Sequence, residues 1–267
     1  MSKYKTEIPQ ASRAKRSESR TDLSVSLKDS GGGRTSAVPD KKRKTNRNIL
    51  VSTYNIRTMR LEEHLLSLEK ELQTIKWDIL GISETRMKGE ANMILKSGHV
   101  LFQRNSETGH HIGGVAIMVN SRIKHLVTKS KAISDRVIYI MLHLNRVQSI
   151  QIIQAYAPTS ASTDEDVEQF YEDLTTAKNQ ENTKFKIIMG DFNAKVGQRT
   201  ATDGLNIGNF GLGTRNIRGE MLLDFLNKEQ MYCMNTFFKK QPQRKWTWRS
   251  PDGAIKNEID YILTTDK

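Results

Sequence analysis

Short apolar runs alternate with helical patterns from residue 48 to the last residue. Runs of strand length cover residues 49–54, 78–83, 113–119, 136–144, 149–157, 185–189, 231–235 and 258–263. Between the first two runs, apolar residues recur at spacings of three and four, as on the buried face of a helix. They are Leu61, Leu65, Leu68, Leu72 and Ile75. Several strands follow one another closely, which indicates a partly antiparallel sheet.

Two more helices are predicted in the second half of the chain. Thr163 and Asp166 have the spacing of a capping box, and an apolar face follows at Val167, Phe170, Tyr171 and Leu174. After a glycine-rich loop around residues 204–213, the next helical face consists of Ile217, Met221, Leu222 and Phe225. Hairpin-like strands mixed with helix-separated strands predict an α/β protein with two sheets covered by helices.

Residues 1–47 differ from the rest in composition. They are rich in Ser, Lys and Arg and show neither the apolar spacing of a helix nor that of a strand. We therefore expect a disordered basic tail over 1–47, followed by one domain over 48–267. The chain carries a net charge of +12, and residues 1–48 hold 13 Lys and Arg against 5 Asp and Glu. Such arms gain affinity by releasing counterions from phosphates, so DNA is the expected partner. A solvated leader without a partner is the alternative.

Other sequence features bear on location and on cysteine chemistry. The basic run 41–44 (KKRK) is typical of a nuclear import signal, so a nuclear or otherwise cytoplasmic location is expected. No apolar run approaches the roughly 18 residues of a membrane span, and the first residues lack a signal-peptide core, so no membrane association is expected. The single Cys233 excludes an internal disulfide and a zinc site of several thiolates.

Polar residues stand where the predicted strands end. These are Asn55, Glu84, Tyr156, Asp191 and Asn193. Singly, each has the ordinary interpretation of a turn or a solvated loop residue. Together they form a set of oxygen ligands and hydrogen-bond donors suited to a hard metal ion and a phosphate.

Six short segments stand out along the chain. They are TYNIR at 53–57, GISETR at 81–86, QAYAPT at 154–159, GDFNAKVG at 190–197, WTWRSPDG at 246–253 and EIDYIL at 258–263. In order and spacing they resemble the motifs of the endonuclease/exonuclease/phosphatase superfamily, from about residue 48 to the end. Within it, AKVG and WRSPDG resemble the endonuclease domain of RTE-type LINE retrotransposons. They equally resemble a host protein that looks derived from such an element.

The resemblance implies a two-sheet α/β sandwich with helices on the outer faces and metal-assisted hydrolysis of a phosphodiester in DNA. Glu84 would bind Mg²⁺, with Mn²⁺ as the other candidate ion, and Asn55 would position the metal or the phosphate. Asp191 would orient and deprotonate the attacking water. Asn193 and Tyr156 would contact the phosphate as negative charge builds.

Two positions depart from the family pattern. Arg57 stands where the abasic-site nucleases carry an Asp. The family also ends in a Ser-Asp-His segment, whereas this sequence has no histidine after His143. We therefore expect a C-terminally truncated fold that lacks its last motif, an Asp260 without the histidine it orients, and impaired activity. His110 and His111 are expected to be solvated loop residues.

A nucleic-acid surface is expected beside this site. Trp248 with Arg249 combines an aromatic face with a cation, and by resemblance both contact DNA, while Trp246 is expected in the core. Asn216 lies in a loop that resembles a phosphate-contacting loop of the family.

Two other functions stay open. A catalytically dead, domesticated derivative could bind chromatin or protein partners through the basic tail. A phosphoesterase such as a phosphoinositide phosphatase or a sphingomyelinase is the other alternative, although the WRSPDG segment and the basic charge count against it.

Overall fold

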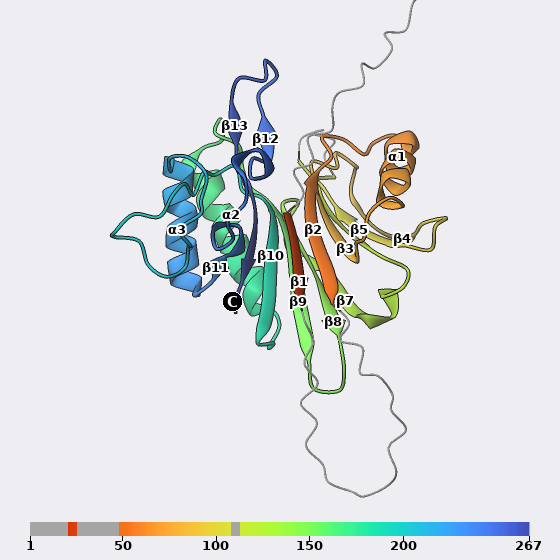
Figure 1. Ribbon diagram of the computed structural model, residues 1–267. Helices are drawn as coiled ribbons and strands as arrows, with labels where there is room; N and C mark the ends of the chain where they lie inside the picture. Colours follow the sequence, from red (N-terminus) through yellow and green to blue (C-terminus); the bar gives the residue numbers. More distant parts are fainter. Residues whose placement is uncertain (1–20, 26–47, 108–112, 267) are drawn as a thin grey trace, which may run out of the picture.

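The computed structural model describes residues 21–25, 48–107 and 113–266. Two six-stranded sheets stand face to face, as Figure 1 shows. The first sheet has the strand order β1-β2-β3-β6-β5-β4 and the second has the order β11-β14-β10-β9-β8-β7. A separate hairpin of β12 and β13 projects beyond the upper end of the sandwich in Figure 1.

The strands of the first sheet are β1 (Thr21–Val25), β2 (Ile49–Asn55), β3 (Ile79–Ser83), β4 (Glu90–Ile94), β5 (Val100–Arg104) and β6 (Val115–Val119). Those of the second are β7 (Val127–Ala132), β8 (Val137–His143), β9 (Ser149–Tyr156), β10 (Phe185–Asp191), β11 (Tyr232–Cys233) and β14 (Asp260–Thr264). The hairpin consists of β12 (Trp248–Arg249) and β13 (Lys256–Asn257). The helices are α1 (Glu62–Leu72), α2 (Asp164–Asn179) and α3 (Ile217–Glu229), with short 3-10 turns at Lys124–Leu126, Met234–Thr236 and Pro242–Arg244.

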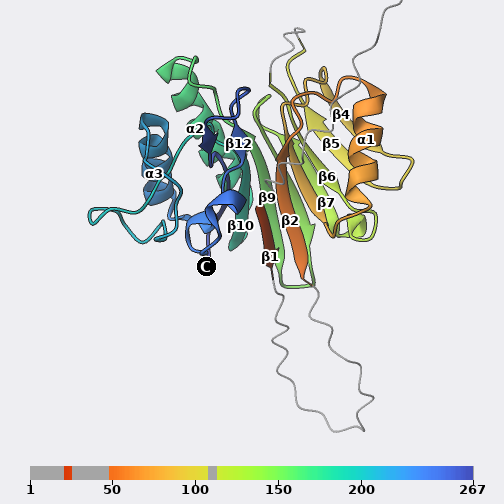
Figure 2. The same ribbon diagram turned by 45° about the horizontal axis from the view of Figure 1, so that its top comes forward.

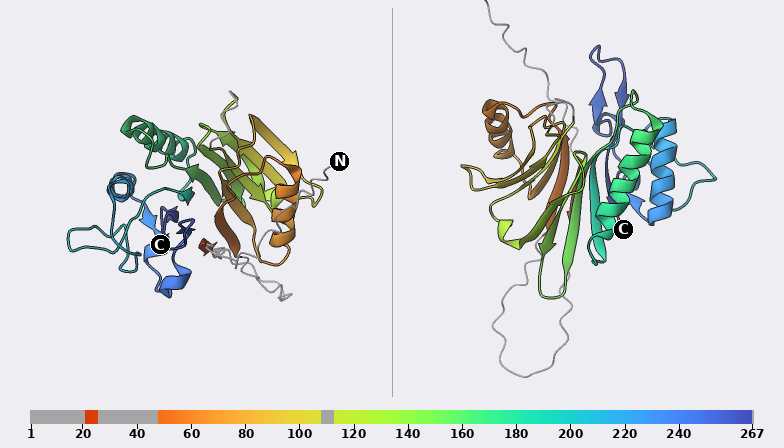
Figure 3. Two further views of the ribbon diagram at one scale, coloured as in Figure 1. Left: turned by 90° about the horizontal axis from the view of Figure 1, so that it is seen from above. Right: turned by 180° about the vertical axis from the view of Figure 1, so that it is seen from behind.

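Three apolar clusters hold the layers together. One lies between the two sheets and is built largely of Val and Ile from β2, β3, β6, β8, β9 and β10. A second packs α1 on the first sheet, and a third packs α2 and α3 on the second. The left view of Figure 3 shows α1 outside one sheet and α2 with α3 outside the other. The α/β sandwich expected from the sequence is thereby confirmed.

Each sheet contains one pair of parallel strands, and the C-terminal ends of both pairs lie at the same edge of the sandwich. β2 runs parallel to β3 in the first sheet, and β9 runs parallel to β10 in the second. The inward side chains of β10 are apolar at Ile187 and Met189 and then become polar at Asp191. The same change takes place along β2, from Val51 to Asn55, so the polar ends of both sheets meet at one edge of the core (Figure 2).

The start of α2 follows the local rule read from the sequence. The Thr163 hydroxyl accepts a hydrogen bond from the Asp166 amide and the Asp166 side chain accepts one from the Thr163 amide, so α2 begins with the expected capping box.

No helix of the described residues is both long and apolar enough to cross a membrane.

Several strands were not predicted. β4, β5 and β7 were missed because each is only five or six residues long and partly exposed, without the continuous apolar run of a buried strand. β1 lies inside the segment expected to be a disordered tail, and it pairs antiparallel with β2 from Thr21↔Thr53 to Val25↔Ile49. Its sequence, TDLSV, alternates polar and apolar residues, which suits a strand covering the open edge of β2. The rest of 1–47, including the basic run 41–44, lies outside the described residues.

Gly190 gives a direct test of the packing between β9 and β10. A Cβ at this position would lie 1.9 Å from the carbonyl oxygen of Ala155, its partner in the strand register. We predict that Gly190→Ala lowers the free energy of unfolding by about 3 kcal/mol or more, because the obstacle is backbone that cannot move aside. Urea denaturation measures the difference.

Gly213→Ala is the matched control. Gly213 also has a positive φ of 71°, but a Cβ there meets no atom within 4 Å. We expect it to cost only about 1 to 2 kcal/mol, the strain of a left-handed alanine. Equal losses for the two variants would show that the β9 and β10 backbones are not packed as described.

Candidate active site at the meeting of the two sheets

Six of the predicted site residues come together where the strands end. Asn55 ends β2 and Glu84 follows β3 in the first sheet. Tyr156 ends β9 and Asp191 ends β10 in the second, with Asn193 two residues later. Asp260 begins β14 directly opposite Asp191 in the antiparallel register. The site is therefore assembled from both sheets, and neither sheet contains it alone.

The side-chain amide of Asn55 joins the two halves. Its Nδ2 donates to Glu84 Oε1 at 2.7 Å and to Asp191 Oδ2 at 3.0 Å. Its Oδ1 accepts a hydrogen bond from the Arg57 backbone N–H at 2.9 Å. The amide nitrogen thus donates to both carboxylates and holds them in position. Direct metal binding by Asn55 stays a prediction.

The backbone beside these residues is in the left-handed region. Arg57, Glu84, Arg86 and Asn193 have φ values of 64°, 56°, 53° and 46°. Among the described non-glycine residues only Gln230, which ends α3, also has a positive φ. Such conformations are unfavourable for most side chains and are often found at functional sites. Here they turn the chain sharply after β2, β3 and β10.

Asp191 and Asp260 are a buried pair of carboxyl groups. Burial raises the pKa of Asp191 to about 6, with a further rise from the charge of Glu84, although hydrogen bonds from Asn193 and Asn55 oppose it. Burial and the charge of Asp191 raise the pKa of Asp260 well above its usual value. Asp260 Oδ1 has no hydrogen-bond partner within the part of the chain that the structure describes. Two adjacent acids in a dry site do not both ionise easily.

Asn193 and Tyr156 lie close to this pair. The Asn193 backbone N–H donates to Asp191 Oδ1 at 2.9 Å, and its side-chain Nδ2 donates to the Ala157 carbonyl at 2.9 Å. Tyr156 is buried, and burial together with the charges of Glu84 and Asp191 raises the pKa of its hydroxyl. Its phenol is therefore a neutral donor at ordinary pH.

The donor set fits a hard divalent cation. Glu84 is partly exposed, with a side-chain exposure of 20%, and shares its two oxygens with Asn55 and with Arg86, 3.1 Å away. Over the described ranges, no three His, Cys, Asp or Glu side chains gather closely enough to form a metal cage by themselves. Mg²⁺ is commonly bound by one or two carboxylates, with water and substrate phosphate completing its shell. Glu84, the partly exposed carboxylate of the cluster, is the residue that could supply such a ligand. Asp260 Oδ1, which has no partner among the described residues, is a buried carboxyl oxygen in the same cluster.

Three predicted nucleic-acid contacts lie outside this cluster. Trp248 is half-buried and Arg249 is exposed, both in the projecting hairpin. Trp246, expected in the core, is half-buried, with Lys256 Nζ 5.1 Å from its ring centre. Asn216 is the N-cap of α3, and its Oδ1 accepts hydrogen bonds from the Gly219 and Lys195 amides at 2.9 Å each. Phosphate contact by Asn216 stays a prediction.

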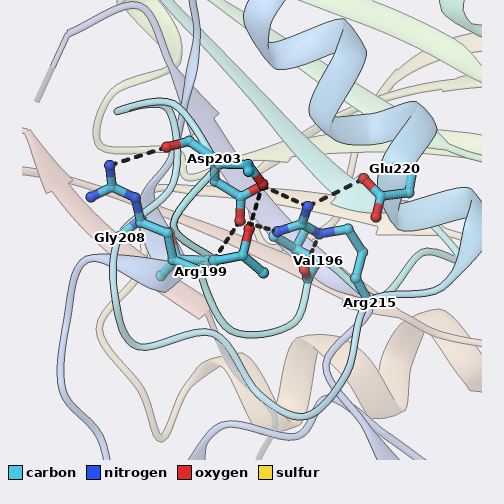
Figure 4. Close-up of polar contacts among 9 residues, drawn as sticks. Val196, Arg199, Asp203, Gly208, Arg215 and Glu220 are labelled. Carbon is cyan, nitrogen blue, oxygen red and sulfur yellow. Dashed lines mark hydrogen bonds and ion pairs between the residues drawn. The ribbon is translucent and has the colours of Figure 1, made fainter.

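The loop after Asp191 is fixed by a buried ion pair, drawn in Figure 4. The Arg215 guanidinium donates to both oxygens of Asp203, at 2.8 and 2.5 Å, and its Nε donates to the Val196 carbonyl at 2.8 Å. The hydrogen bond from Arg215 lowers the pKa of Asp203 below its usual range. The Val196 amide in turn donates to the Tyr261 hydroxyl, next to Asp260. The loop and β14 are thus held in one framework.

Sequence reasoning missed three residues that contact the site residues and a fourth that contacts Ser83, the neighbour of Glu84. Arg86 pairs with Glu84, and the Arg136 guanidinium lies 5.5 Å from the centre of the Tyr156 ring. The Thr247 hydroxyl oxygen accepts from the Asp260 amide at 3.1 Å, and Gln154 donates to Ser83 at 2.9 Å. The sequence signal for three of them was their place inside the quoted motifs, which contain Arg86, Gln154 and Thr247. His110 and His111 lie outside the described residues.

A two-sheet sandwich with acidic and amide side chains gathered at the strand ends is the arrangement of an endonuclease/exonuclease/phosphatase domain. The chain belongs to the endonuclease/exonuclease/phosphatase family, whose model matches residues 52–267. Enzymes of this family generally use divalent metal ions. The fold also matches an endonuclease/exonuclease/phosphatase family protein from Leptotrichia buccalis, with a TM-score of 0.50 and 15% identity over 81% of this chain and 87% of that one.

Two curated relatives have the same name. Craniofacial development protein 2 of Bos taurus is 30% identical over 256 residues, which are 92% of this chain and 42% of the relative. The protein of that name from Tragulus javanicus is 32% identical over 214 residues, or 80% of this chain and 36% of the relative. The chain therefore spans less than half the length of either relative.

The Asp203–Arg215 pair predicts a pH-dependent stability. The pKa of Asp203 is lower in the folded than in the unfolded state, so its contribution is complete above the unfolded value of about 4 and is lost as the pH falls below it. We predict that Asp203→Asn lowers the free energy of unfolding at pH 7 by about 3 kcal/mol, because the largely buried arginine then keeps only one carboxylate partner, the exposed Glu220 at 3.2 Å. Below about pH 4 the wild type should approach the variant. Urea titrations between pH 3 and 8 measure this.

Asp164→Asn is the control for the ion pair. Asp164 pairs with Arg218 at 2.9 Å, but its side chain is 77% exposed, so little change is expected at any pH. A constant difference between wild type and Asp203→Asn across the pH range would contradict the assignment.

Proposed function

We propose that this chain is a Mg²⁺-dependent phosphodiesterase that nicks DNA. The observation that carries the proposal is the Asn55 amide, which holds the Glu84 and Asp191 carboxylates in one site across two sheets. One of these carboxylates is partly exposed and available to a cation, while the other is buried with a pKa of about 6. A metal ligand next to a base with a near-neutral pKa is suited to hydrolysis with water as nucleophile.

In the proposed reaction, each site residue has a separate role. Asp191 takes a proton from a water molecule as the water oxygen forms a bond to phosphorus. The bond from phosphorus to the leaving oxygen then breaks, and that oxygen takes up a proton from solvent. Asn193 and the neutral Tyr156 hydroxyl donate hydrogen bonds to the phosphate oxygens as their negative charge increases. A Mg²⁺ ion bound through Glu84 supplies Lewis-acid stabilisation of the same charge.

Charge and shape support DNA as the substrate. The hairpin of β12 and β13 projects from the end of the sandwich where β2 and β10 end (Figure 1), and it carries Trp248, Arg249 and Lys256. Aromatic faces with nearby cations suit stacking on bases and contact with phosphates. The net charge of +12 favours a polyanion over a small ester.

The proposed origin is an RTE-type LINE retrotransposon. The support is the resemblance of the AKVG and WRSPDG segments, at 194–197 and 248–253, to the endonuclease domains of such elements. Location in the nucleus, where such a nuclease would meet its substrate, belongs to the same proposal and rests on the basic run 41–44.

A second candidate function is DNA or chromatin binding without cleavage. The observation in its favour is Asp260, whose Oδ1 is buried without a partner and which no histidine of the described ranges contacts. Loss of one member of a catalytic set commonly costs several powers of ten in rate. Binding through the hairpin would survive such a loss.

Nicking of supercoiled plasmid distinguishes the two candidates. We predict Mg²⁺-dependent nicking that EDTA abolishes and that Asp191→Asn reduces by about 10³-fold, because the amide cannot accept the proton. Asp224→Asn, on the exposed side of α3, is the matched control and should nick like the wild type. A folded wild-type chain that binds DNA without nicking it would move the assignment to the second candidate. Equal nicking by Asp191→Asn would contradict the proposed role of that residue.

The hairpin is tested by the salt dependence of DNA binding. We predict that Arg249→Ala weakens binding and lowers the slope of log affinity against log salt by about 1, since one phosphate contact is lost. Lys228→Ala removes an exposed cation from α3, away from the hairpin, and serves as the control. Fluorescence anisotropy on a short duplex gives both slopes. If the two variants behaved alike, the hairpin would not be the DNA surface.

A further inference from the structure

Gln154 forms a hydrogen bond between the two sheets directly beneath the site. It lies on β9, two residues before Tyr156, and is completely buried. Its Nε2 donates to the Ser83 hydroxyl of β3 at 2.9 Å and to its neighbour's carbonyl, Ala155, at 3.2 Å. Buried hydrogen bonds have a defined direction and length, whereas the apolar cluster between the sheets does not specify a single register.

Ser83 is connected to both site residues of the first sheet. It immediately precedes Glu84, and it is paired with Asn55 in the parallel register of β2 and β3. Its carbonyl accepts a hydrogen bond from the Ile56 amide at 3.1 Å, next to Asn55. A displacement of Ser83 would therefore move Asn55 and Glu84 together.

The Gln154 side chain occupies space that a glycine on the facing strand leaves free. A Cβ at Gly81, on β3, would lie 1.8 Å from Gln154 Oε1, so a larger residue there would displace the amide. Gln154 Oε1 itself is buried and has no partner among the described residues.

We propose that Gln154 is a positioning residue that sets the distance between the two halves of the site. Through Ser83 it fixes Asn55 and Glu84 of the first sheet relative to Tyr156 and Asp191 of the second. The part of this inference that concerns catalysis rests on the proposed phosphodiesterase function. Displacement of reacting groups by about 1 Å can cost on the order of 10²-fold in rate.

Gln151 provides a closely matched control on the same strand. It is also completely buried, its Nε2 donates one hydrogen bond, to the Ala177 carbonyl of α2 at 2.7 Å, and its Oε1 likewise has no partner among the described residues. It faces the helix layer and not the other sheet. Gln154→Met and Gln151→Met both keep the side-chain length, and the first removes two buried hydrogen bonds where the second removes one. Gln154→Met should therefore lose somewhat more stability, and the two variants are compared under conditions in which both remain folded.

The experiment compares the two variants in nicking kinetics and in amide hydrogen exchange of the whole chain. Gln154→Met should lower kcat by about 10- to 100-fold with little change in KM. It should also speed exchange in residues 54–57 and 83–86, where the Ile56 amide is protected by Ser83. Gln151→Met should leave kcat unchanged and speed exchange near the end of α2 instead.

Ser83→Ala tests the route of the effect without touching Gln154. If Gln154 acts through Ser83, the double variant Gln154→Met/Ser83→Ala should lose no more kcat than the larger single loss. Additive losses, or equal kcat values for Gln154→Met and Gln151→Met, would overturn the inference. If the wild type does not nick DNA, the proposed function fails separately. Hydrogen exchange then decides, and unchanged exchange at 54–57 and 83–86 in Gln154→Met would reject the positioning role.

Discussion

The arrangement of the site depends on the burial of Asp191 opposite Asp260. The two carboxyl groups are register partners on β10 and β14, and both are nearly inaccessible to solvent. Burying one acid beside another is unfavourable unless protons or hydrogen bonds compensate. The Asn193 amide and the Asn55 side chain supply the hydrogen bonds to Asp191, and both come from sharply turned segments with left-handed residues.

This constraint explains why the site needs both sheets. The Asn193 amide donates to one oxygen of Asp191 from the loop after β10, and the donor to the other oxygen comes from the facing sheet, from Asn55 at the end of β2. The same amide reaches Glu84, so the buried base and the accessible metal ligand are linked by one side chain. The sheets are otherwise joined by an apolar cluster, which provides stability but little directional control. Polar contacts at the site and beneath it, including the buried hydrogen bond from Gln154 to Ser83, fix how the sheets are aligned.

Much of the fold was readable from hydrophobic patterning. The inward strands are continuous apolar runs, and the helices show clear three- and four-residue spacing, so their order predicted two covered sheets. β1 and β4 escaped because their few apolar residues alternate with polar ones over only five positions. The ordered motifs pointed to Asn55, Glu84 and Asp191 before any geometry was known. The contacts that support the site were not readable, since Gln154 reaches Ser83 and Thr247 reaches Asp260 from segments distant in the chain.

The most direct test of this account is an NMR pH titration of the Asp191 and Asp260 carboxyl groups in the metal-free chain. Burial predicts that the Asp191 carboxyl titrates near pH 6, and burial with the charge of Asp191 predicts that the Asp260 carboxyl has a pKa well above its ordinary value. Asp252, exposed on the hairpin with its pKa lowered by the Ser250 hydroxyl and the Ala254 amide, is the internal reference. Midpoints near the ordinary value of about 4 for both buried groups would contradict the central claim.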